Sequence, residues 1–109
     1  MNVRLYLWQR LTAALMLPLL LVHLAVIFYA MRKGFSAADI LARTRGSIAW
    51  AAFYGVFVVA AAVHAPIGLR TVLAEWTSLG PRWRDLVAIA FGFLLAVLGF
   101  RAVAAVVLA

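Results

Sequence analysis

Residues 48–69 read IAWAAFYGVFVVAAAVHAPIGL and carry no Asp, Glu, Lys or Arg. A run of about 20 apolar residues is long enough, as a helix, to cross the hydrocarbon core of a bilayer. Inside lipid every backbone polar group must be paired within its own segment, which a helix achieves and a single strand does not. This stretch therefore predicts a transmembrane helix.

Two further apolar runs flank this stretch, at about residues 11–31 and about residues 86–108. The first run is free of charge, and the last holds only Arg101 near its far end, where a long side chain can reach the interface. A cleaved signal peptide is the alternative for the first run, but its apolar part exceeds the usual length of about 7–15 residues. We predict one all-α membrane domain over residues 1–109, with three transmembrane helices.

The composition supports a membrane protein and excludes several function classes. Hydrophobic residues make up 69% of the 109 residues and charged residues 12%, against about half and a quarter in soluble domains. The net charge of +7 comes from basic residues at the ends of the apolar runs, where they meet lipid phosphates rather than nucleic acid. The absence of cysteine excludes disulfides, thiolate catalysis and iron–sulfur clusters held by this chain.

The connections between the runs, at residues 32–47 and 70–85, carry most of the charge. Ser36, followed three residues later by Asp39, predicts a capping box for one short interfacial turn at residues 36–41. Two tryptophans of the second connection are placed like interfacial anchors. Basic residues are divided almost evenly between the two sides, so the positive-inside rule does not decide the orientation.

The two histidines, His23 and His64, both fall inside apolar runs, where a polar group is costly and usually functional. At about 1.5 Å per residue, His64 lies about 9 Å and His23 about 20 Å from the N-terminal face. Imidazole is a common axial ligand of haem iron. Their different depths favour two stacked cofactors, each completed by a partner helix, over one ligand that joins both; packing or hydrogen bonding is the alternative role for each.

The residues around His64 allow more than one interpretation. Ala60, Ala61 and Gly68 share its helical face and leave space for a flat macrocycle or, equally, for a neighbouring helix. Pro66, and Pro18 in the first run, each free one backbone carbonyl and can bend their helices. The spans contain no carboxylate, which argues against a proton-coupled transporter.

Two short motifs resemble a known family. Residues 64–70, HAPIGLR, followed by Glu75, are similar to the second-helix signature of the membrane-anchor (cytochrome b) subunits of succinate dehydrogenase and fumarate reductase. Residues 8–13, WQRLTA, are similar to the Gln-Arg-x-Thr-Ala form of that family's first helix. Length and three-span layout extend the resemblance over nearly the whole chain.

The resemblance implies that His64 is an axial ligand of haem b and that Arg10 lies near a quinone and a haem propionate. His23 is an additional histidine that resembles the two-haem members, so the chain holds one haem or shares two across a dimer. Tyr6 and Gln9 stand where the family usually has Ser and His, and Glu75 where Asp is commoner. The implied cofactor residues are His64, His23, Arg10, Gly68 and Arg70, and the implied quinone residues are Arg10, Tyr6, Gln9 and Thr12.

The resemblance also implies partners and a location. The chain would be a multi-pass protein of a bacterial inner membrane, with a cytoplasmic N-terminus, that docks a flavoprotein and an iron–sulfur subunit. A second anchor chain or a second copy of itself would complete the anchor, and the dehydrogenase chemistry on succinate or fumarate would lie on the partner subunits. The alternative is a non-catalytic helical scaffold or assembly subunit without haem.

Overall fold

The computed structural model describes residues 3–109 as four helices and no strand. Three of the helices, α1, α3 and α4, are long and apolar enough to cross a membrane. This confirms the predicted all-α fold with three candidate membrane spans. The helices are α1 (Val3–Lys33), α2 (Ala37–Thr44), α3 (Ile48–Trp76) and α4 (Pro81–Val107).

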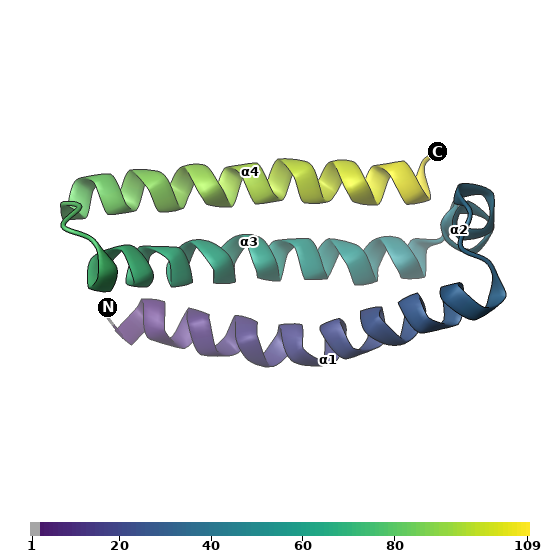
Figure 1. Cartoon of the computed structure of the whole chain (residues 1–109), viewed down its shortest axis with the longest axis horizontal. Coiled ribbons are helices and arrows are strands. Elements are labelled where there is room, and N and C mark those ends of the chain that lie inside the picture. The colour runs from purple at the N-terminus through teal and green to yellow at the C-terminus, as the bar shows by residue number, and fades with distance from the viewer. Residues whose placement is uncertain (1–2) are drawn as a thin grey trace.

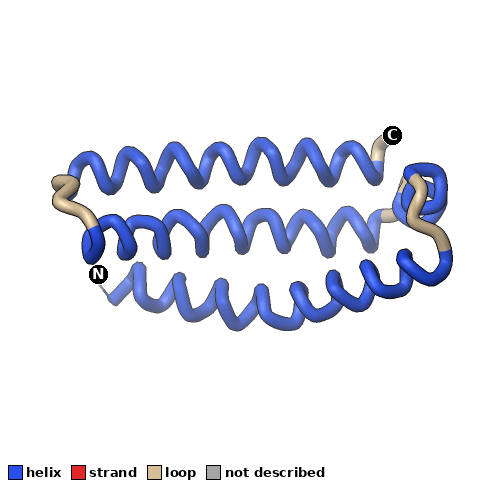
Figure 2. Tube along the Cα trace, in the orientation of Figure 1, coloured by secondary structure: helices blue, strands red, loops and turns tan. Residues whose placement is uncertain are grey.

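The central helix of the bundle is α3, which packs against both α1 and α4 (Figure 1). The long helices run antiparallel in chain order, and the molecule is elongated, with extents of 48 × 23 × 22 Å. The start of α1 and the α3–α4 loop lie at one end, which we call the N-terminal end. The short helix α2 and the C-terminus lie at the other, the α2 end (Figure 2).

The helices extend further than the apolar runs that predicted them. Helix α1 begins at Val3 rather than near residue 11, and α3 continues through Arg70 and Glu75, so the predicted loop at residues 70–85 shrinks to residues 77–80. Hydropathy marks only the part of a helix that lies in hydrocarbon, whereas charged end residues are compatible with helical backbone beyond it. Pro81 starts α4 at the first helical position, where its missing N–H costs nothing.

Helix α2 joins the long helices at the α2 end. Its capping box is present as predicted, but the helix reaches Thr44 instead of ending near residue 41. The Thr44 hydroxyl donates to the carbonyl of Val106 (2.6 Å), and the Gly46 N–H donates to that of Val107 (2.7 Å). These bonds satisfy carbonyls that the C-terminus of α4 would otherwise leave unpaired, and so attach α2 to α4.

The helices meet through small residues. A Cβ on Gly99 would lie 2.6 Å from Cγ1 of Val58, and one on Gly92 would lie 2.9 Å from Cγ of Pro66, so α3 and α4 approach closely, as membrane helices often do. No large side chain is fully buried among residues 3–109, and many large apolar side chains of α1 and α4 are exposed. A single chain therefore leaves broad apolar faces for lipid or for other membrane chains.

Candidate functional site

His64 lies on α3 with its ring against α1. Its Nδ1 is 3.2 Å from Oγ1 of Thr12, and this is the ring's only hydrogen bond within residues 3–109, so Nε2 has no protein partner there. Thr12 is 6% exposed, one of the two buried polar residues of the described chain. The contact joins two polar side chains inside spanning helices, where unpaired polar groups are costly.

The Thr12 hydroxyl is also bound to its own helix. Its Oγ1 lies 2.7 Å from the carbonyl oxygen of Trp8 and 3.2 Å from that of Gln9. Thr12 is among the residues that the sequence resemblance implies for quinone binding. In the structure its hydroxyl faces His64 and its own backbone carbonyls, between α1 and α3.

Gln9 and Gly68 meet close to this pair. A Cβ on Gly68 would lie 3.2 Å from the side-chain Nε2 of Gln9, so the missing side chain makes room for the glutamine. Gln9 Oε1 is buried and has no hydrogen-bond partner among residues 3–109. A small residue at position 68 could make room for a macrocycle or for a neighbouring helix, and the structure favours the neighbouring helix. The side chain of Gln9 also places an unpaired acceptor near the N-terminal end.

Arg10 and Tyr6 form a pair on the surface of α1. The Arg10 guanidinium donates to the Tyr6 hydroxyl (3.2 Å) and lies 5.6 Å from the centre of the Tyr6 ring. Both residues are exposed. The pair therefore presents a cation and a phenol at the N-terminal end, open to a ligand or to lipid phosphates.

Arg70 of α3 contacts α4. Its guanidinium forms an ion pair with Asp85 of α4, and the side chains of the two residues are 31% and 50% exposed. His64 contacts α1 whereas Arg70 contacts α4, so the structure does not bring these two predicted cofactor residues together. The sequence interpretation missed this pairing because it placed both residues of the ion pair in a loop.

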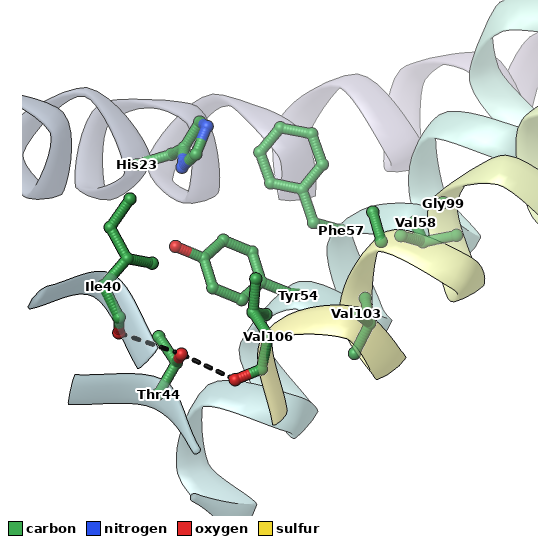
Figure 3. A pocket seen from close by; sticks show the side chains of 10 residues that line it. His23, Ile40, Thr44, Tyr54, Phe57, Val58, Gly99, Val103 and Val106 are labelled. Atoms are coloured by element: carbon green, nitrogen blue, oxygen red, sulfur yellow. Dashed lines mark hydrogen bonds between the residues drawn. The ribbon is translucent and has the colours of Figure 1, made fainter. Parts of the chain in front are cut away.

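His23 lies toward the α2 end of α1, against two aromatic rings of α3. Its ring meets Tyr54 and Phe57 edge to face, with centroids 5.7 and 6.0 Å away. Its Nδ1 is buried and has no hydrogen-bond partner in the described part of the chain. A cavity of about 320 Å³ opens beside it, bounded by residues of all four helices, Ile40 of α2 among them (Figure 3).

The two histidines occupy separate levels of the bundle. Thr12 lies beside His64, and His23 lies beside Tyr54. Tyr54 and His64 are ten positions apart on α3, which corresponds to about 15 Å along the helix axis. One ligand cannot be held by both rings of a single chain, and an iron coordinated by two imidazoles at either level would need the second from another chain.

The hydrogen bonding of the His64 ring is compatible with an axial haem ligand. The ring has one nitrogen anchored and the other without a protein partner among residues 3–109, as a coordinating imidazole requires. An apolar hollow of about 460 Å³, lined in part by Trp8, Ala60 and Val63, borders Thr12, and His64 is not among the residues that line it. The described residues contain no cluster of three or more His, Cys, Asp or Glu side chains that would hold a bare metal ion.

No family model, curated protein or solved structure matches the chain.

Proposed function

We propose that the chain is the haem b-binding membrane anchor of a succinate:quinone oxidoreductase, either a succinate dehydrogenase or a fumarate reductase. The observation that carries the proposal is the His64 ring, which lies within a candidate membrane span, is anchored at Nδ1 by Thr12, and has no protein partner at Nε2 within residues 3–109. Polar groups at membrane depth are expensive and mark functional sites. The resemblance of residues 64–70 and 8–13 to the family's motifs supports the same function.

His64 would hold the haem iron through Nε2. A haem b in this position supplies one-electron transfer between the iron–sulfur clusters of a partner subunit and a quinone. His23 is the candidate ligand of a second haem: its edge-to-face contacts with Tyr54 and Phe57 favour a packing role, whereas its unpaired Nδ1 favours ligand binding.

The quinone would bind at the N-terminal end. The exposed Arg10 guanidinium can donate to a quinone carbonyl or to a haem propionate, and Tyr6 holds it in place through a hydrogen bond. Gln9 Oε1, which is buried and has no partner within residues 3–109, can accept a hydrogen bond from a quinol hydroxyl at the same end. These residues orient the quinone and stabilise charge at its carbonyl oxygen.

The same end would dock the soluble subunits. A flavoprotein and an iron–sulfur subunit would cover it on the cytoplasmic side of a bacterial inner membrane. The broad exposed apolar faces of α1 and α4 can accept a second anchor chain or a second copy of this one, from which a second axial imidazole for His64 would come. Two copies would also bring two His23 side chains to the level near the α2 end.

Replacing His64 tests the proposal directly. In the His64→Ala variant, purified with its co-purifying subunits, we expect loss of the haem that His64 holds: all of the haem if His23 only packs, and half if His23 holds a second one. His23→Ala is the matched control, because it removes the same chemical group from the other level and should leave the His64 haem in place. Unchanged haem content in His64→Ala would reject the assignment.

A further inference from the structure

We infer that Thr12 is a positioning residue for the iron ligand, which holds His64 in the tautomer that carries its proton on Nδ1 and presents a lone pair at Nε2. The inference rests on the proposed function, since it assigns a role to Thr12 within the same site. It also separates Thr12 from the quinone residues.

The assignment follows from the hydrogen bonds of one hydroxyl. A threonine hydroxyl has a single proton, and a backbone carbonyl can only accept. The Thr12 Oγ1 lies 2.7 Å from the Trp8 carbonyl and 3.2 Å from the Gln9 carbonyl, so its proton is directed to its own helix. Only its lone pairs remain for His64, and the 3.2 Å contact must therefore be donated by a proton on Nδ1.

The tautomer determines what the other ring nitrogen can do. A neutral imidazole with its proton on Nδ1 has an unprotonated Nε2, which is the form that coordinates a metal. In many metal sites the ligating histidine donates its second N–H to an acceptor, which fixes the ring orientation and raises the basicity of the ligand. Thr12, itself held by the backbone of α1 and buried, is such an acceptor.

The test compares Thr12→Val with Thr12→Ser in the complex as purified. Valine keeps the shape of threonine but removes the acceptor, so the haem should be lost to excess apomyoglobin about 10 to 100 times faster. The reduction potential of the remaining haem should rise, because a less basic ligand stabilises ferric iron less. Thr12→Ser keeps the hydroxyl, so its rate of haem loss and its reduction potential should stay close to those of the unmodified chain.

Thr71→Val is the matched control, because among residues 3–109 the Thr71 hydroxyl donates only to the Ile67 carbonyl of its own helix; it should change neither property. A Thr12→Val protein that lacks haem altogether, while Thr12→Ser and Thr71→Val retain it, also supports the inference. A Thr12→Val protein with the haem loss rate and potential of the unmodified chain overturns it. If the unmodified complex itself binds no haem, the proposed function fails first, so the two failures are distinguishable.

Discussion

Thr12 of α1 and His64 of α3 are 52 positions apart in the sequence, yet Oγ1 and Nδ1 lie 3.2 Å apart. The same packing of α1 against α3 places His23 beside Tyr54 at the other level. The bundle thus has one histidine level near the basic N-terminal end and another near α2. We assign haem binding to His64 at the first level. At the second level, His23 either packs against α3 or holds a second haem.

Arg10→Ala should slow quinone-linked turnover without affecting the soluble subunits. Arg10 is exposed at the N-terminal end, and a hydrogen bond from a charged donor contributes about 1.5–3 kcal/mol, which corresponds to about 10- to 100-fold in rate. Succinate oxidation measured with an artificial electron acceptor should be retained. Quinone-linked turnover and succinate oxidation with the artificial acceptor are measured on one preparation, and the ratio of the two rates should fall in Arg10→Ala.

Arg4→Ala provides the control for this prediction, because Arg4 is another exposed arginine of α1 on the same side. We expect its quinone-linked turnover to stay close to that of the unmodified complex. Equal loss of both activities in Arg10→Ala would indicate failed assembly instead of a quinone contact.

Gly99→Ala should destabilise the bundle relative to Gly55→Ala. Both changes gain about 1 kcal/mol of helix propensity, but the new Cβ at position 99 meets the stiff side chain of Val58 at 2.6 Å, whereas position 55 has nothing within 4 Å. Overpacking of this kind costs about 1–3 kcal/mol. SDS titration in micelles, followed by circular dichroism, measures the difference; equal stability of the two variants would contradict the close approach of α3 and α4.

The capping box of α2 predicts a pH dependence. Hydrogen bonds from the Ser36 hydroxyl and then from its backbone N–H hold the pKa of Asp39 below its ordinary value of 3.8. Because the folded pKa is depressed, the stabilisation is present above 3.8 and is lost as the pH falls through the folded pKa. Ser36→Ala should raise the pKa of Asp39 toward 3.8, measured by NMR titration of the carboxyl carbon, whereas Ser78→Ala should not. An unchanged value in Ser36→Ala would refute the interpretation.

The fold was predictable because lipid imposes one rule on every segment. Three charge-free or nearly charge-free runs are enough to identify three helices, since an apolar helix is the structure that pairs its backbone within hydrocarbon. The ends were less predictable: Arg70 and Glu75 continue α3, although their charge suggested a loop. The capping box of α2 was visible in the sequence because it depends only on Ser36 and Asp39, three positions apart.

The site was predictable only in part. A histidine inside a span is conspicuous because polar groups are costly there. His64 and His23 could therefore be selected from the sequence alone. Their partners depend on the register between helices, which no local pattern encodes. Thr12 was singled out by a motif, but its contact with His64 required the antiparallel placement of α1 against α3, and the ion pair of Arg70 with Asp85 required the α3–α4 turn.

The most direct test of the central claim is a dithionite-reduced minus oxidised visible spectrum of the chain purified with its partners, with haem counted per copy. Haem ligation by His64 predicts the α-band of a low-spin b-type haem. One haem per copy in a homodimer would assign ligand roles to both His64 and His23, and one haem per anchor pair would assign it to His64 alone. A flat spectrum from a folded, fully assembled preparation would contradict the account and favour a haem-free scaffold.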